Sequence, residues 1–196
     1  MTPAIDSFMH MPYVIAVVGM AGSGKSEAAQ FFREKGIHVL RFGDVIDEGI
    51  AVEGLPWTPE NNVYYRGKIR KQLGMEAVAI KMLPKIKERV EKSKNIIIDG
   101  LYSWEEYLYL RKELSQLFLL CIYARPSIRY ARLEKRIERP FSKVDAVRRD
   151  ITEIEESHKA GPIAIANYLV KNETSIEEFK AKLEDFWQIL SKKEYI

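Results

Sequence analysis

The sequence has little cysteine or histidine and no long apolar run, and each shortage excludes a class of protein. The single cysteine, Cys121, excludes an internal disulfide and fits a reducing compartment, so we expect a cytoplasmic protein. The three histidines, His10, His38 and His158, do not have the spacing of a metal site. No apolar run approaches the ~20 residues that span a bilayer, so we expect no membrane partner.

The chain also lacks a strong charge of either sign. Its net charge of +3 is too small to indicate a nucleic-acid partner, while 46% hydrophobic and 30% charged residues are typical of a globular protein. The start, "MTPAIDSFMHM", has neither the basic nor the apolar region of a signal peptide. We expect residues 1–12 to form a flexible tail and residues 13–196 to form one domain.

Five short apolar runs alternate with longer amphipathic segments that have the periodicity of helices. Near-continuous apolarity indicates strands buried on both faces, as in a parallel sheet covered by helices. The alternation predicts an α/β protein with three layers, a five-stranded parallel sheet between helices. We also expect a helix with an internal break near Pro84, an N-cap at Ser103 and a capping box of Ser175 and Glu178. The runs are "YVIAVV", "IHVLRF", "NIIIDG", "LFLLCIY" and "ANYLVKN".

The stretch "GMAGSGKS" lies between the first predicted strand and a predicted helix, and it matches the phosphate-binding P-loop pattern G-x-x-x-x-G-K-[ST]. Glycines allow consecutive backbone N–H groups to form an anion nest, which the helix N-terminus reinforces. A glycine-rich turn without a ligand is the alternative, but the four fixed positions rarely coincide in this context. We expect a nucleoside triphosphate, with Lys25 on its phosphates and Ser26 on Mg²⁺. The expected contacts are Gly19, Ala21, Gly22, Ser23, Gly24, Lys25 and Ser26.

Asp99 ends the apolar run "NIIID", where a carboxylate can hold Mg²⁺ through its water shell. The alternative is an aspartate in an Asp-Gly turn. Gly100 follows, whereas motor ATPases generally have an acidic residue there, and no Asn-Lys-x-Asp motif indicates a GTPase switch. Transfer of the γ-phosphate to a bound acceptor is therefore favoured.

The motifs "GMAGSGKS", "RFGDVI", "IIIDG", an arginine-rich stretch and a late "VKN" come in an order that resembles nucleoside monophosphate kinases and dephospho-coenzyme A kinase. The chain is most similar to a largely archaeal family of adenylate-kinase-related P-loop proteins. The resemblance covers about the whole chain from Tyr13 to Leu190. It implies a kinase-type fold with a five-stranded parallel sheet, ATP with Mg²⁺ as the donor, and a short lid over the phosphates.

The resemblance places Asp44 of "FGDVI" at the acceptor site. A carboxylate there could act as the base for an attacking ribose hydroxyl. If the acceptor is a phosphate, Asp44 would instead position the substrate, because a phosphate needs no base. The alternative without an acceptor role is an N-cap on the following helix.

The chain departs from the related kinases at two positions where they often carry arginine. Asp47 stands three residues after Asp44, and Leu101, Tyr102 and Ser103 follow the Asp-Gly of the third strand. Those arginines would hold the phosphate of the acceptor, so their loss puts ordinary AMP phosphorylation in doubt. We expect Tyr102 to contact the acceptor and any acceptor phosphate to be held from elsewhere.

The stretch "VYYRGKIRKQLG" is the main candidate for that role, because it falls in the expected acceptor-binding insertion, about 44–75. Arginine binds phosphate bidentately and aromatic faces stack on bases. We expect Arg66 and Arg70 to bind the acceptor. A solvated basic helix face is an equally good interpretation.

The expected lid is about 129–150, "RYARLEKRIERPFSKVDAVRRD". Arg132 and Arg136 are predicted to share one helix face, and Arg139, Arg148 and Arg149 follow. Arginines that close over phosphates stabilise the phosphoryl-transfer transition state. The alternative is a surface helix pair with salt bridges to Glu134 and Glu138.

We assign catalytic roles to Lys25, Asp44, Arg136 and Arg149. We expect the nucleotide to contact Arg132, Arg136 and Asn172, the last because Asn172 follows the fifth strand, where related kinases shape the adenine pocket.

These patterns favour a kinase that uses ATP and Mg²⁺ to phosphorylate a nucleoside monophosphate or a similar nucleotide-like small molecule. The second hypothesis is a dephospho-coenzyme A kinase, in which Asp44 would be a true base. The third is a regulatory or RNA-processing ATPase, which leaves a nucleic-acid partner open but not favoured. A monomer and a homodimer are both compatible with the sequence.

Overall fold

The computed structural model describes residues 12–92, 94–137 and 140–192. Its centre is a sheet of five parallel strands in the order β2-β3-β1-β4-β5. Each strand coincides with one of the five apolar runs, so the predicted α/β class and the predicted sheet are confirmed. The strands are Val14–Val18 (β1), His38–Arg41 (β2), Ile96–Asp99 (β3), Leu117–Tyr123 (β4) and Tyr168–Lys171 (β5).

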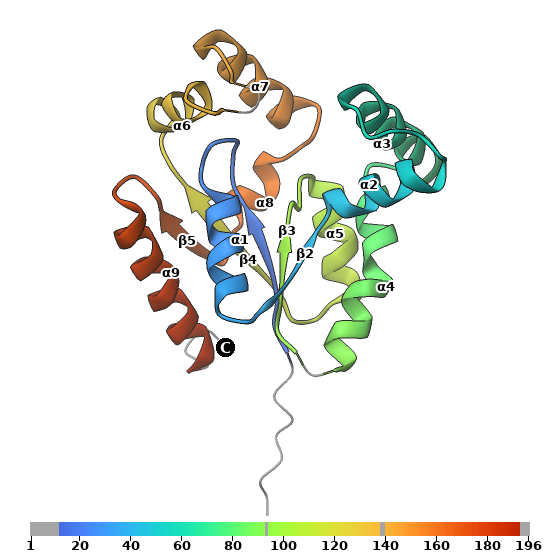
Figure 1. Ribbon diagram of the computed structural model, residues 1–196. Helices are drawn as coiled ribbons and strands as arrows, with labels where there is room; N and C mark the ends of the chain where they lie inside the picture. The colour runs from blue at the N-terminus through green and yellow to red at the C-terminus, as the bar shows by residue number, and fades with distance from the viewer. Residues whose placement is uncertain (1–11, 93, 138–139, 193–196) are drawn as a thin grey trace, which may run out of the picture.

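Helices cover both faces of this sheet (Figure 1). Alternate residues of a strand point to opposite faces, so Val14 and Ala16 of β1 pack in one core while Ile15 and Val17 pack in the other. The first core includes residues of α4 and α5, and the second includes residues of α1 and α9. Burial on both faces explains why the central strands β3, β1 and β4 are almost entirely apolar.

The helices are Lys25–Glu34 (α1), Gly43–Val52 (α2), Pro59–Leu73 (α3), Ala77–Glu91 (α4), Trp104–Glu113 (α5), Pro126–Glu134 (α6), Lys143–Glu155 (α7), Ala160–Ala164 (α8) and Ile176–Ser191 (α9). The predicted N-cap at Ser103 is confirmed, and it forms a full capping box with Glu106. The Ser175 hydroxyl likewise accepts a hydrogen bond from the Glu178 amide.

The predicted break at Pro84 is wrong, because α4 continues through it. Proline removes one backbone hydrogen bond and disfavours a helix interior. Here Val78 and Met82 before it and Ile86 after it are all buried in one core, so packing holds the two halves in one helix.

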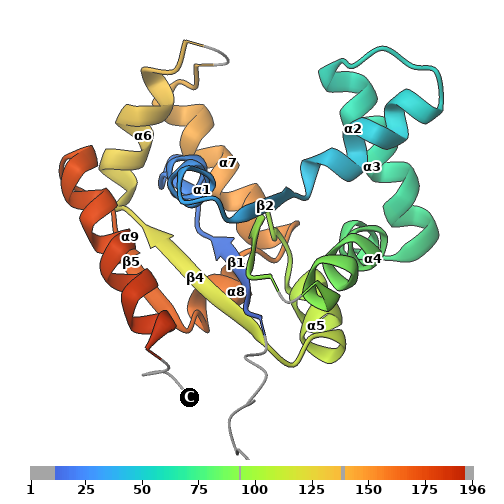
Figure 2. The same ribbon diagram turned by 60° about the horizontal axis from the view of Figure 1, so that its bottom comes forward.

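Two helical arms lie above the carboxyl ends of the strands (Figures 1 and 2). One arm contains α2 and α3 and falls in the predicted acceptor-binding insertion, 44–75. The other contains α6 and α7 and includes the predicted lid, 129–150. β1 lies between β3 and β4, and the connections from the neighbouring strands run to opposite sides of the sheet at this point. Open α/β sheets bind ligands at the carboxyl ends of the strands where the strand order reverses in this way. Among the helices of the described ranges, none combines the length and apolarity needed to cross a bilayer.

Candidate active site

The loop between β1 and α1 is pressed against its surroundings at the glycine positions. Gly22 and Gly24 have φ angles of +79° and +104°, which residues with a side chain rarely adopt. A Cβ at Gly22 would lie 2.7 Å from the Arg129 carbonyl oxygen, and one at Gly24 would overlap the Asn172 amide. The glycines therefore give the loop its curvature and let it sit against α6 and the end of β5.

Lys25 folds back over this loop, where its Nζ donates to the carbonyl oxygens of Gly19 at 2.8 Å and Met20 at 3.1 Å. Burial lowers the pKa of Lys25 to about 7, and repulsion from Lys159 adds to the effect. A buried ammonium of this kind is stabilised by an anion, and triphosphate oxygens are the ligands that such a loop binds.

Asn172 and Arg132 support the loop from the other side. The Asn172 side chain donates to the Ser23 carbonyl oxygen at 2.8 Å and accepts from Arg132 Nη2 at 3.2 Å. Arg132 Nη1 and the Ser23 hydroxyl are both buried without a hydrogen-bond partner among the described residues. Buried polar atoms of this kind are usually satisfied, so these two fit a polar ligand at the loop. Any contact between Asn172 and adenine stays a prediction.

Asp99 and Ser26 lie where the fold can present them to a metal ion. Asp99 is the last residue of β3, paired in register with Val17 just before the loop, and Ser26 is exposed in the first turn of α1. Burial raises the pKa of Asp99, and Lys25 acts against that shift. The described residues contain no group of three or more Cys, His, Asp or Glu that could hold a metal alone. Asp99 and Ser26 therefore fit a Mg²⁺ ion whose other ligands would include the nucleotide.

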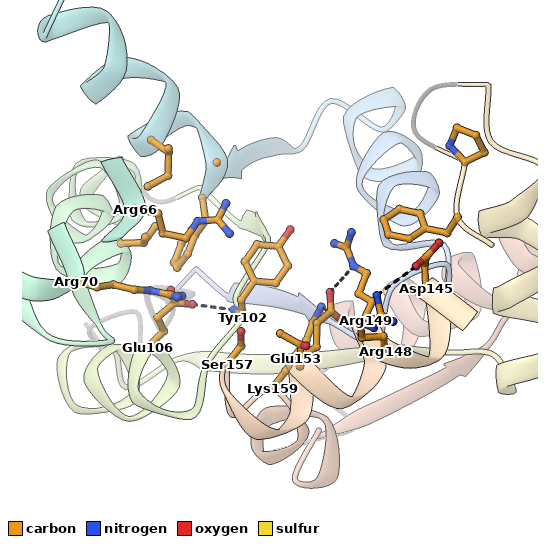
Figure 3. Close-up of a pocket in the computed structure, with 17 residues that line it drawn as sticks. Arg66, Arg70, Tyr102, Glu106, Asp145, Arg148, Arg149, Glu153, Ser157 and Lys159 are labelled. Atoms are coloured by element: carbon orange, nitrogen blue, oxygen red, sulfur yellow. Dashed lines mark hydrogen bonds and ion pairs between the residues drawn. The ribbon is translucent and has the colours of Figure 1, made fainter. Parts of the chain in front are cut away.

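A cavity of about 640 Å³ opens between the two arms (Figure 3). Arg66 and Arg70 line it from α3, while Arg148 and Arg149 line it from α7. Tyr102 stands between the two pairs. The described lining also contains Lys159, the carboxylates of Glu106, Asp145 and Glu153, and the residues Phe42, Gly43, Ile46, Val78, Pro140, Phe141, Thr152 and Ser157. Cations outnumber carboxylates in this set, so the cavity suits an anionic ligand.

The acceptor candidates Arg66, Arg70 and Tyr102 come together in this cavity. Arg66 donates to Asn62 at 3.0 Å, whereas Arg70 Nε is buried and has no hydrogen-bond partner among the described residues. Burial lowers the pKa of Arg70 and raises the pKa of Tyr102 to about 12, so the phenol keeps its proton. The helix face of Arg66 and Arg70 is therefore turned to the cavity rather than only to solvent.

Asp44 is not part of the described cavity lining. Its carboxylate accepts a hydrogen bond from Arg41 Nε at 2.7 Å, and Arg41 also pairs with Asp47 at 2.5 Å. The N-cap alternative for Asp44 is wrong, because α2 begins at Gly43 with Phe42 as its N-cap. The contact with Arg41 therefore occupies Oδ1 of the Asp44 carboxylate.

The expected lid arginines are only partly brought together. Arg136 does not share a helix face with Arg132, because α6 ends at Glu134 and the Phe141 amide bonds back to the Leu133 carbonyl. Arg136 is exposed beyond the helix. Arg139, like Glu138, lies outside the described residues. Arg148 pairs with Asp145 at 3.7 Å and Arg149 with Glu153 at 3.0 Å.

Arg129 connects the loop to α7, and sequence reasoning did not single it out. It is 4% exposed, forms two hydrogen bonds to the Asp150 carboxylate at 2.9 and 2.6 Å, and donates to the Ala21 carbonyl oxygen at 3.1 Å. The Tyr130 hydroxyl also donates to Asp150. A single arginine thus links the P-loop, α6 and α7.

Lys159 and Glu106 were also missed. Lys159 is 3% exposed at the floor of the cavity, and Glu106 is 1% exposed beside Arg70. Burial raises the pKa of Glu106 to about 7, although its Oε2 accepts from the amides of Tyr102 and Ser103. The capping-box spacing of Ser103 and Glu106 was a local signal for the second residue, whereas nothing near Lys159 marks it.

The strand order, the P-loop and the two arms define a P-loop protein of the kinase-like class. The family described as AAA domain matches residues 15–155. The chain belongs to the UPF0200 family, being 36% identical over 176 residues to the UPF0200 protein of Pyrococcus abyssi, which covers 87% of this chain and 93% of that one. It is 33% identical over 177 residues to the UPF0200 protein of Methanocaldococcus jannaschii, 89% of each chain. The resemblance to a largely archaeal P-loop family is confirmed.

Solved kinases share the fold at low sequence identity. The dephospho-CoA kinase of Campylobacter jejuni has a TM-score of 0.59 and 16% identity, with 94% of this chain and 100% of that chain covered. The shikimate kinase of Bacteroides thetaiotaomicron has a TM-score of 0.60 and 13% identity, with 91% and 98% covered. At these identities the neighbours show the fold alone, so the activity and the acceptor are argued from the site.

Proposed function

We propose that the protein is an ATP- and Mg²⁺-dependent phosphotransferase whose acceptor is a nucleoside monophosphate or a similar nucleotide-like anion. The observation that carries this proposal is the cationic cavity beside the P-loop. Lys25 interacts electrostatically with Glu153, Arg149 and Lys159, all of which line the cavity. A donor on the P-loop therefore has its terminal phosphate next to the space that an acceptor would fill.

The reaction requires positioning and charge stabilisation more than covalent chemistry. The bond from the γ-phosphorus to the bridging oxygen breaks, a bond to an acceptor oxygen forms, and ADP leaves. An acceptor phosphate oxygen is already anionic, so no base is required. In this proposal Lys25 and Arg149 stabilise the charge on the transferred group. Ser26 and Asp99 would hold Mg²⁺, which would offset negative charge on the donor phosphates.

The pairing of Asp44 with Arg41 favours a phosphate acceptor over a ribose hydroxyl. Hydroxyl transfer gains about 10²–10⁴-fold from a positioned base. The carboxylate that the sequence offers for this role is already paired with Arg41 and lies outside the described lining.

An acceptor screen tests the proposal. The protein is incubated with ATP and Mg²⁺ and with nucleoside monophosphates, dephospho-coenzyme A or RNA in turn, and products are identified by mass. We expect ADP to form rapidly only with a nucleoside monophosphate or a related phosphorylated acceptor. Phosphorylation of dephospho-coenzyme A would indicate hydroxyl transfer instead. ATP hydrolysis stimulated by RNA alone would contradict the kinase proposal.

A further inference from the structure

The cavity holds more buried positive charge than the predicted site residues account for. Lys159 precedes α8, and its side chain is 3% exposed. Its ammonium lies 2.7 Å from Glu153 Oε2 and 4.8 Å from the centre of the Tyr102 ring. Burying an ammonium of a flexible side chain is costly unless its surroundings compensate for the charge.

Glu153 compensates for only part of this charge, because it is shared. Its Oε1 accepts from Arg149 at 3.0 Å while its Oε2 accepts from Lys159. The P-loop Lys25 is close enough for Lys159 to disfavour its charged form. Three cations thus gather around Glu153, with Asp99 as a further carboxylate near Lys25. An ammonium also has three N–H donors, of which the contact with Glu153 uses one.

Lys159 contacts Tyr102, which stands where related kinases are expected to carry an arginine. Related kinases are expected to carry an arginine two or three residues after the Asp-Gly that ends the third strand, and here Tyr102 occupies that stretch. Lys159 lies over the ring of this same tyrosine. Lys159, which precedes α8, therefore lies beside the position after β3 where the arginine is missing.

We propose that Lys159 is a substrate-binding residue that holds the phosphate of a phosphomonoester acceptor, in place of the missing arginine. The proposal rests on the proposed function and specifies it: the acceptor carries a phosphate, and that phosphate lies between Lys159 and Arg149 on one side and Arg66 and Arg70 on the other. The ring of Tyr102 helps to hold the ammonium itself through a cation–π contact, and the anion would accept from the N–H donors that Glu153 does not use.

The test measures binding without turnover. Wild-type protein, Lys159→Gln and Lys159→Arg are first saturated with a non-hydrolysable ATP analogue and Mg²⁺, so that the P-loop is filled. Binding of AMP and of adenosine is then measured by calorimetry. Lys112→Gln, an exposed lysine on α5, is the matched control. Glu153 keeps its partner Arg149 in each variant, so no carboxylate is left buried alone.

We expect Lys159→Gln to weaken AMP binding about 10- to 100-fold, as for the loss of one charge-assisted hydrogen bond, and to leave adenosine and the ATP analogue nearly unaffected. Lys159→Arg should keep most of the affinity. An unchanged AMP affinity in Lys159→Gln, an equal loss for AMP and adenosine, or a loss confined to the ATP analogue would overturn the proposal. Absence of AMP binding to the loaded wild-type protein would overturn it too.

Failure of the broader kinase proposal has a different signature. It appears in the acceptor screen as a lack of acceptor-dependent ADP, whatever the binding of AMP. The role of Lys159 is judged from binding alone, so the two results are independent.

Discussion

At the scale of single residues, Lys25 of the P-loop carries a charge that a bound nucleotide would stabilise. Lys25 Nζ is held by two carbonyl oxygens of the loop, and burial lowers its pKa to about 7. The ammonium is therefore favoured below pH 7 and lost as the pH rises through that value. Bound triphosphate favours the ammonium again and should raise this pKa.

Competitive acetylation across a range of pH measures the pKa of Lys25 directly. We expect the acetylation of Lys25 in the free protein to have its midpoint near pH 7, and ATP with Mg²⁺ to move the midpoint upward. Lys68, whose pKa is raised by the hydrogen bond that it donates to Glu53, is the internal control and should react only at high pH. A Lys25 midpoint near 10, or one that ATP does not move, would contradict the description of this site.

A substitution at Asp44 distinguishes a phosphate acceptor from a hydroxyl acceptor. Because its carboxylate is paired with Arg41 and lies outside the described cavity lining, we expect Asp44→Asn to change kcat less than about tenfold, below the effect of losing a base. Steady-state kinetics with the acceptor found in the screen give kcat and KM. Asp47→Asn, which removes the other partner of Arg41, is the matched control. A pure kcat loss of two or more decades in Asp44→Asn alone would favour hydroxyl transfer.

At the scale of the elements, the α2–α3 arm depends on one close approach. Gly49 is buried in α2, and a Cβ there would overlap the ring of Tyr65, which is itself buried in α3. The ring packs where a side chain would otherwise be, so the two helices can hold Arg66 and Arg70 against the cavity.

Two glycine substitutions in this arm should have opposite effects. We expect Gly49→Ala to lower the free energy of unfolding by about 1–3 kcal/mol, as overpacking does. Gly67 lies in α3 with open space where its Cβ would be, so Gly67→Ala should raise the free energy of unfolding by about 0.5–1 kcal/mol. Urea unfolding measures both. A similar change in both variants would mean that helix propensity alone, not the Tyr65 contact, decides the result.

At the scale of the whole molecule, Arg129 is the point where the P-loop and helix α7 are joined. It holds Ala21 of the loop and Asp150 of α7 from within α6. These partners are far apart in the chain. The hydrogen bonds of Arg129 therefore join the P-loop, α6 and α7, which secondary structure alone would leave independent. The position of Arg149 relative to Lys25 depends on this connection.

Arg129→Lys keeps the charge but loses the planar fork that reaches both partners. We expect the free energy of unfolding to fall by about 1–3 kcal/mol and amide hydrogen exchange in α7 to accelerate more than exchange in β1 and β4. Arg125→Lys is the matched control, since Arg125 precedes the same helix and pairs with Glu173 only at 3.7 Å on the surface. Uniform acceleration throughout the protein would show a general loss of stability rather than a local loosening of α7.

The sequence alone determined the strands, the class of fold and the P-loop, because each depends on neighbours in the chain. Near-continuous apolar runs favour strands of a covered parallel sheet, and the glycines, lysine and serine of residues 19–26 form one local structure. The same is true of the cap at Ser103. The helix break at Pro84 failed because core packing outweighed a local preference.

Only the tertiary structure decided which charges face the cavity. Arg129 meets Ala21 across 108 positions and Lys159 meets Tyr102 across the space between α8 and β3, and no periodicity records such distances. Arg136 and Arg149 looked alike in the sequence, yet α6 ends before the first and α7 places the second on the cavity wall. An ionic side chain acquires its role from the partners that desolvate and pair it, and those partners come from distant segments that the fold alone brings together.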